Sequence, residues 1–101
     1  MPLIVIGLNH KTAPVDIRER LTFGPDVIVA AMRTLRDQTP VDEAIILSTC
    51  NRTEIYCAAD ASDIETPVRN WLGTFHGIEP QLFAQHLYIH KDRSAVTHLF
   101  K

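Results

Sequence analysis

Apolar positions along this chain follow two periods, and the change from one to the other marks the predicted elements. Continuous or alternating apolar runs predict strands at residues 3–8, 44–49, 53–58 and 87–90. Apolar residues three and four positions apart predict helices at residues 15–21, 25–39, 63–76 and 93–101, with a short helical turn within 79–85. The strands and the two long helices follow the order strand, helix, strand, strand, helix, strand. This order predicts an α+β fold, a ferredoxin-like βαββαβ sandwich in which an antiparallel sheet carries its helices on one face.

Start and stop residues set the limits of the two long helices. Gly24 is a candidate N-cap, with Pro25 at the first helical position, and Pro40 ends the helix. The run Ser62–Glu65 resembles a capping box at the start of the next helix, and Gly77 ends it. The apolar stripes on both helices are expected to pack in the core, and so is Trp71.

The last predicted helix follows Asp92, which can act as its N-cap. Its inward positions are expected to be Ala95, Val96, Leu99 and Phe100. No residue that ends a helix occurs before Lys101. We therefore expect the chain to be a piece of a longer protein.

The strands at 44–49 and 53–58 are so close in sequence that an antiparallel hairpin is the simplest connection, with Cys50–Arg52 at its turn. Alternation places Ile55 and Cys57 on one face and Glu54 and Tyr56 on the other. We therefore interpret Cys57 as a structural core residue.

Composition narrows the function classes. The chain has 101 residues, of which 46% are hydrophobic and 22% charged, so residues 1–101 suit a single compact domain. A formal net charge of −2 gives no general attraction to phosphates, so any RNA contact should be local. The two cysteines form neither a CxxC motif nor a zinc pattern, and no basic leader or bilayer-spanning run occurs. A reduced, cytoplasmic setting without a membrane is expected.

Cys50 is the candidate nucleophile. A thiol attacks as the thiolate, and a nearby cation such as Arg52 favours the anion. The alternative is that Cys50 is a small apolar residue without chemistry.

Three motifs carry a resemblance to a known family. Ser48–Glu54 resembles the catalytic-cysteine motif of glutamyl-tRNA reductase, Gly7–Pro14 resembles the N-terminal signature of that family, and Ala95–Phe100 matches a third family motif. The matches follow the order of the family and span nearly the whole chain. The family enzymes are much longer, and the N-terminal domain of the family has a similar βαββαβ layout.

The resemblance implies a reaction and roles for individual residues. In the family, a cysteine attacks the ester of glutamyl-tRNA, and NADPH reduces the resulting thioester to glutamate-1-semialdehyde, the first step of tetrapyrrole (porphyrin and haem) synthesis from glutamate. By resemblance, Cys50 is the nucleophile, Arg52 recognises the substrate carboxylate, and His98 assists catalysis. Thr49 is expected to bind substrate, with an ordinary strand residue as the alternative.

Four further residues are candidates for supporting roles. Asn51 and Glu54 are expected to hold the turn and orient Arg52. Asn9 and His10 leave the first predicted strand and can approach the hairpin turn.

The chain holds no G-x-G-x-x-G motif, so no cofactor-binding residues are expected in it. The resemblance implies that NADPH is bound by a domain absent from this chain. It also implies a homodimer formed through a further absent domain, and channelling of the product to the next enzyme of the pathway.

Two other functions remain open from the residues. One is a ferredoxin-like ligand-binding or regulatory module in which Cys50 is incidental. The other is a thiol hydrolase with a Cys50–His98 dyad. A metal site at His86 and His90 is disfavoured, because no acidic or thiol partner has suitable spacing.

Overall fold

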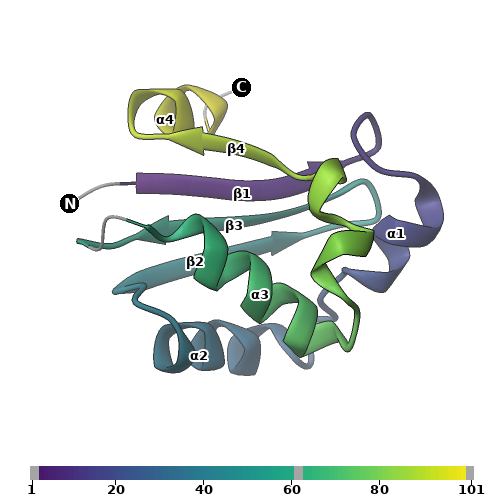
Figure 1. Cartoon of the computed structure of the whole chain (residues 1–101), viewed down its shortest axis with the longest axis horizontal. Coiled ribbons are helices and arrows are strands. Elements are labelled where there is room, and N and C mark those ends of the chain that lie inside the picture. The colour runs from purple at the N-terminus through teal and green to yellow at the C-terminus, as the bar shows by residue number, and fades with distance from the viewer. Residues whose placement is uncertain (1–2, 61–62, 100–101) are drawn as a thin grey trace.

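A computed structural model describes residues 3–60 and 63–99, and it contains one four-stranded sheet (Figure 1). The strands are β1 (Leu3–Asn9), β2 (Glu43–Ser48), β3 (Arg52–Ala58) and β4 (Tyr88–Lys91), in the order β2-β3-β1-β4. All three pairings are antiparallel, and β2 and β3 form the predicted hairpin. This order and these directions confirm the ferredoxin-like α+β fold.

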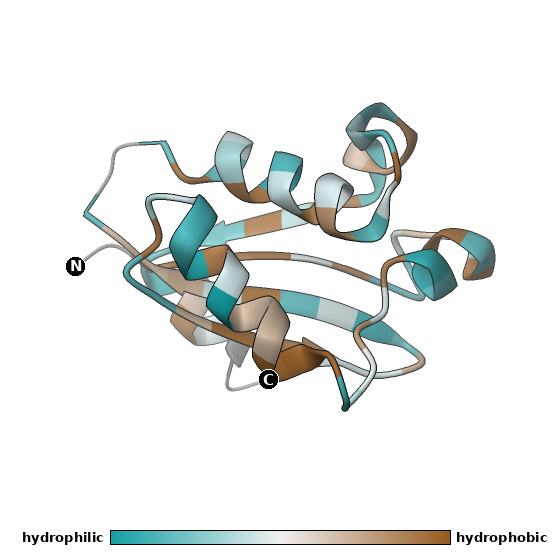
Figure 2. Ribbon diagram, turned by 90° about the horizontal axis from the view of Figure 1, so that it is seen from below, coloured by the Kyte–Doolittle hydropathy of each residue, from teal (hydrophilic) through white to brown (hydrophobic). Residues whose placement is uncertain are grey.

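The helices follow the predicted sequence of elements. They are α1 (Val15–Arg20), α2 (Ile28–Gln38), α3 (Glu65–His76) and α4 (Arg93–Leu99), and the predicted turn before β4 is a pair of 3₁₀ helices, η1 (Pro80–Leu82) and η2 (Ala84–His86). The two long helices, α2 and α3, pack on one face of the sheet, as Figures 1 and 2 show. Among the described helices, none is long and apolar enough to cross a bilayer.

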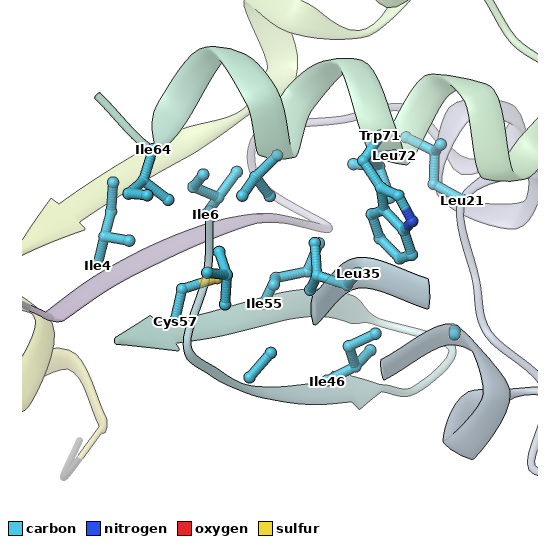
Figure 3. Close-up of a cluster of buried hydrophobic side chains, with 14 of the residues drawn as sticks. Ile4, Ile6, Leu21, Leu35, Ile46, Ile55, Cys57, Ile64, Trp71 and Leu72 are labelled. Carbon is cyan, nitrogen blue, oxygen red and sulfur yellow. The ribbon is translucent and has the colours of Figure 1, made fainter. Parts of the chain in front are cut away.

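The core lies between the sheet and the two long helices (Figure 3). Ile55 and Cys57 on β3 are buried in it, as alternation predicts. Trp71 on α3 is also buried, and its indole Nε1–H donates to Thr34 Oγ1 on α2 at 3.3 Å. Phe23 stacks against the Trp71 ring with the centroids 6.0 Å apart. Trp71 is therefore a core residue, as predicted.

The opposite face of the sheet is only partly open, because α4 packs against it beside β1 and β4 (Figure 1). Val5 on β1 points to this face and is fully buried, and so is Ala95 on α4. Burial on both faces explains why β1 is a continuous apolar run. Toward β2 the face is uncovered, and Ile45 is 66% exposed.

Two helix starts differ from the prediction. The helix expected at Pro25 begins at Ile28, because residues 25–27 form a preceding turn in which the Gly24 carbonyl accepts the Val27 and Ile28 N–H groups. Gly24 is therefore not the N-cap. At α3 the N-cap residue is Ile64, which makes no side-chain cap, and the preceding Asp63 accepts the Thr66 N–H through Oδ1 at 3.5 Å, while Ser62 lies outside the described residues. Gly77 ends α3 in the left-handed conformation, with φ 66°, as predicted.

The start of α4 also corrects the prediction. In the part of the chain that the structure describes, the Asp92 side chain forms no hydrogen bond with the first N–H groups of the helix, and its Oδ1 accepts the Leu3 N–H of β1 at 3.2 Å. Asp92 itself has a φ of 52°, a left-handed conformation that Asp adopts more readily than most residues. Ala95 points inward as expected, but Val96 is 44% exposed and does not. The side chain of Leu99 and all of Phe100 lie outside the described residues.

Candidate functional site

The turn between β2 and β3 is organised by Thr49. Its hydroxyl oxygen accepts the backbone N–H groups of Asn51 and Arg52, each at 3.2 Å. Its own N–H donates to the Arg52 carbonyl at 2.8 Å. An acceptor side chain that binds N–H groups two and three residues ahead is the usual way for Thr to fix a turn. The turn-holding role predicted for Asn51 thus belongs to Thr49, whose part in substrate binding stays a prediction.

Ser48, at the end of β2, ties this hairpin to the rest of the domain. Its Oγ accepts the Phe23 N–H at 2.9 Å and lies 3.2 Å from the hydroxyl of Thr53 on β3. These bonds fix the end of β2 and the start of β3, on either side of the turn. The turn is consequently held on both sides.

Cys50 is exposed at the tip of this turn. Arg52 begins β3, and its side chain is 49% exposed. In the described residues no hydrogen bond involves the Cys50 sulfur. The thiol and the guanidinium are therefore both accessible from solvent and separated by one residue.

The end of β1 lies beside the start of β3, where Asn9 is the register partner of Arg52. The Asn9 side chain is used locally: its Oδ1 accepts the N–H groups of Lys11 at 2.9 Å and Thr12 at 3.1 Å. His10 is exposed. The predicted approach of this loop to the hairpin turn is therefore confirmed for the backbone, while functional roles for Asn9 and His10 stay predictions.

Glu54, two positions after Arg52, lies within β3 and is fully buried under α4. The Arg52 Nη1 lies 3.7 Å from its Oε1, which also accepts the Tyr56 hydroxyl at 2.9 Å. Its Oε2 accepts hydrogen bonds from the Tyr88 hydroxyl and from His98 Nε2. The prediction that Glu54 holds the turn is therefore wrong, but Glu54 does contact Arg52.

These contacts decide the charge of Glu54. Burial alone would raise its pKa, but hydrogen bonds from Tyr88, His98 and Tyr56 and the charge on His98 outweigh burial and lower the pKa. The phenols respond in the opposite sense. Burial and the bond to Glu54 raise the pKa of Tyr56 to about 12 and raise that of Tyr88 further. The site therefore holds a buried carboxylate anion surrounded by donors.

The helix α4 brings His98 to this carboxylate, although His98 and Glu54 are far apart in sequence. Its ring lies 5.3 Å from the Tyr88 ring and stacks on His90 at 4.5 Å. Because a carboxylate only accepts hydrogen bonds, Nε2 of His98 carries a proton. Within residues 3–60 and 63–99, no hydrogen bond joins His98 to Cys50. The structure thus brings His98 to Glu54 and forms no Cys50–His98 dyad.

Sequence reasoning missed Tyr88 as a site residue and assigned Tyr56 no function. One signal was present: alternation places Glu54 and Tyr56 on the same face of β3, and a carboxylate in the middle of a strand needs donors when it is buried. The donors from β4 and α4 have no such signal, since they come from distant parts of the chain.

The remaining histidines have other partners. His86 Nδ1 lies 2.9 Å from the Thr12 carbonyl, and His90 Nδ1 lies 2.9 Å from the Ser94 hydroxyl. His76 packs edge-on against Phe23, and burial lowers its pKa. No cluster of three or more metal-ligating side chains occurs in the part of the chain that the structure describes.

A hollow of about 410 Å³ lies elsewhere, at the C-terminal end of α3. It is lined by Gly73, Thr74, Gly77, Ile78, Glu79 and Pro80. It includes none of the predicted site residues.

Comparison with known proteins points to one family. Residues 6–101 match the family model "Glutamyl-tRNAGlu reductase, N-terminal domain". The chain is 45% identical over all 101 residues to the glutamyl-tRNA reductase of Marinomonas sp. (strain MWYL1), and covers 24% of that protein. It is 48% identical, again over all 101 residues, to the glutamyl-tRNA reductase of Shewanella oneidensis, of which it also covers 24%. The chain therefore spans about a quarter of the length of these relatives.

A solved structure agrees in fold. The glutamyl-tRNA reductase from Methanopyrus kandleri superposes with a TM-score of 0.71 at 24% sequence identity, over 97% of this chain and 21% of that one. At this identity the likeness shows the fold alone. The family model spans nearly the whole sequence, and the chain belongs to the glutamyl-tRNA reductase family, whose N-terminal domain it matches.

Proposed function

We propose that this chain is the acyl-transfer part of a glutamyl-tRNA reductase and that Cys50 takes the glutamyl group from glutamyl-tRNA. One observation carries the proposal: a fixed hairpin turn presents an exposed thiol beside an arginine that a buried carboxylate contacts. The family membership supports the identity of the substrate.

The reaction of the chain is a transesterification. The Cys50 thiolate attacks the carbonyl carbon of the aminoacyl ester, the bond from that carbon to the ribose oxygen breaks, and the oxygen leaves as a hydroxyl after gaining a proton. The product is a thioester on Cys50 and free tRNA. A thioester accepts a nucleophile or hydride more readily than an oxygen ester does, which is a reason for sulfur at this position.

Arg52 suits the recognition of the glutamate side chain. Its guanidinium is planar and can bind a carboxylate with two parallel hydrogen bonds. The contact with Glu54 limits the positions of the guanidinium while leaving half of the side chain exposed. The net charge of −2 means that RNA affinity should depend on such local contacts.

NADPH does not fit this chain. The described sheet is antiparallel throughout, so it lacks the parallel βαβ unit and glycine-rich turn that cradle a dinucleotide. We therefore assign NADPH, the reduction to semialdehyde and any dimerisation to parts of the complete enzyme other than residues 1–101. The step assigned to this chain ends at the thioester.

The test is to mix glutamyl-tRNA carrying labelled glutamate with the chain, quench in acid, and locate the label by peptide mapping. We expect label on the peptide that contains Cys50, free glutamate released slowly by water, and no semialdehyde with or without NADPH. Cys50→Ala should lose the label, and Cys57→Ala should keep it. An unlabelled wild type, or equal labelling of Cys50→Ala, would exclude the proposed role of Cys50.

A further inference from the structure

Glu54 has two carboxylate oxygens, and the structure gives each a different set of partners. Oε1 accepts the Tyr56 hydroxyl at 2.9 Å and faces Arg52 Nη1 at 3.7 Å. Oε2 accepts the Tyr88 hydroxyl and His98 Nε2. The chain has only two tyrosines, and both bind this one carboxylate.

The two sets lie at different parts of the site. Arg52 is half exposed at the start of β3, next to the turn that presents Cys50. His98 comes from α4, with its side chain 19% exposed. Its ring stacks on His90 and lies tilted against the Tyr88 ring. Glu54 is thus a buried link between the residue suited to bind a carboxylate and the residue suited to transfer a proton.

The bond to Glu54 also fixes which nitrogen of His98 is available. Nε2 holds its proton against Oε2, which leaves Nδ1 as the ring nitrogen that can gain or lose a proton. A carboxylate that fixes the tautomer of a histidine in this way is a recurring device in enzymes that transfer protons. Its effect depends on a carboxylate that does not rotate.

The two tyrosines keep the carboxylate from rotating, and Gly7 leaves room for this arrangement. Each tyrosine donates to one oxygen, so rotation would break both bonds. Gly7 of β1 lies beneath: a Cβ there would come 2.8 Å from Glu54 Cγ and 3.1 Å from the Tyr88 hydroxyl. The lack of a side chain at Gly7 therefore leaves the space in which these two groups meet.

We propose that the two tyrosines are positioning residues with separate tasks, Tyr56 supporting Arg52 and glutamate binding through Oε1, and Tyr88 supporting His98 and proton transfer through Oε2. This inference rests on the proposed acyl transfer to Cys50. It assigns a role to Tyr88, which no motif of the sequence indicates.

The matched variants are Tyr56→Phe and Tyr88→Phe, which each remove one hydroxyl and keep the ring. Single-turnover acylation of Cys50 is measured at a series of glutamyl-tRNA concentrations. Tyr56→Phe should raise the half-saturating concentration, and Tyr88→Phe should lower the maximal rate, each by roughly tenfold, as expected for loss of a hydrogen bond to a charged group. The maximal rate of Tyr56→Phe and the half-saturating concentration of Tyr88→Phe should each change by less than about threefold.

A second readout does not depend on acylation. The His98 Nε2–H proton is observed by NMR, assigned by its loss in His98→Gln. Tyr88→Phe should shift this resonance, because its hydroxyl shares Oε2 with His98, and Tyr56→Phe should leave it in place. A structural role alone would alter thermal unfolding without separating the two variants in this way.

The outcomes are distinct. Equal effects of the two variants on both kinetic constants, or a shift of the His98 resonance in Tyr56→Phe alone, would overturn the division of tasks. If wild type is not acylated on Cys50, the proposed function fails, and the resonance then decides the positioning claim by itself. If Tyr88→Phe does not fold, Tyr56→Phe decides it, because a lowered maximal rate with unchanged half-saturation would contradict the task given to Tyr56.

Discussion

Gly7 of β1 lies directly opposite Glu54 of β3 in the antiparallel register, and a Cβ at Gly7 would come within 2.8 Å of Glu54 Cγ. The same Cβ would come 2.8 Å from the Thr53 carbonyl oxygen, which is backbone and cannot move aside. The buried carboxylate that contacts Arg52 and His98 therefore depends on a residue without a side chain on the neighbouring strand.

Gly7→Ala should accordingly reduce both stability and Cys50 acylation. Overpacking of a buried site typically lowers the free energy of unfolding by about 1–3 kcal/mol, measured here by urea denaturation. Gly24→Ala is the matched control, because the Cβ there would approach only Asp26 Oδ1, the end of a flexible exposed side chain. If both variants lost the same stability, space for Glu54 would not be what Gly7 provides.

Arg52→Lys should fold normally and acylate Cys50 poorly. The ammonium keeps the charge but cannot form two parallel bonds to a carboxylate, and loss of a charged hydrogen bond predicts a roughly tenfold to hundredfold fall in acylation efficiency. The measurement is the labelling rate at low glutamyl-tRNA concentration. Arg36→Lys, exposed on α2, is the control. Wild-type acylation by Arg52→Lys would remove Arg52 from substrate recognition.

The elements of this fold could be predicted from the sequence because their signals are local. Alternation at Ile55 and Cys57 identifies the core face of β3, and the short spacing of β2 and β3 leaves a hairpin as the simplest connection. The glycine that ends α3 has the left-handed φ that its position requires.

The buried network could not be predicted, because it depends on where α4 packs. That position is reached through Asp92, whose left-handed backbone and bond to Leu3 follow from tertiary contacts and not from helix periodicity. If the packing of α4 over β1 and β4 is not known, the sequence predicts that Glu54 is an exposed strand residue near a turn. Cys50, Arg52 and His98 could be found because they lie in sequence motifs, whereas Tyr88 lies outside those motifs and reaches Glu54 only through the pairing of β4 and β3 with β1.

Cys57→Ala should leave acylation intact and lower the free energy of unfolding by about 1 kcal/mol, since the lost sulfur leaves a small void in the core. Burial raises the pKa of Cys57 to about 12 from 9.0. The neutral thiol therefore stabilises the fold below pH 9, and this contribution is lost as the pH rises from 9.0 toward about 12. Urea denaturation across this range should show a smaller alkaline loss in Cys57→Ala than in wild type. Loss of acylation by folded Cys57→Ala, with acylation kept in Cys50→Ala, would show that the wrong cysteine was assigned.

Comparing the stability of Glu54→Gln and wild type as the pH falls tests whether Glu54 is a buried anion. The pKa of Glu54 is lowered from 4.5 in the folded state, so its carboxylate stabilises the fold fully above pH 4.5, and this contribution is lost as the pH falls through the folded pKa. Gln keeps the shape but not the charge, and its single amide oxygen can accept hydrogen bonds at only one of the two positions that the carboxylate oxygens occupy. The variant should therefore be less stable than wild type at neutral pH, and the difference should shrink in acid. Urea denaturation of both proteins between about pH 7 and pH 3 measures that difference. A difference that stays constant over this range would mean that folding does not lower the pKa of Glu54. A wild type that instead gains stability relative to the variant as the pH falls would mean that Glu54 is protonated in the folded protein, and Arg52 and His98 would then have no buried charge between them.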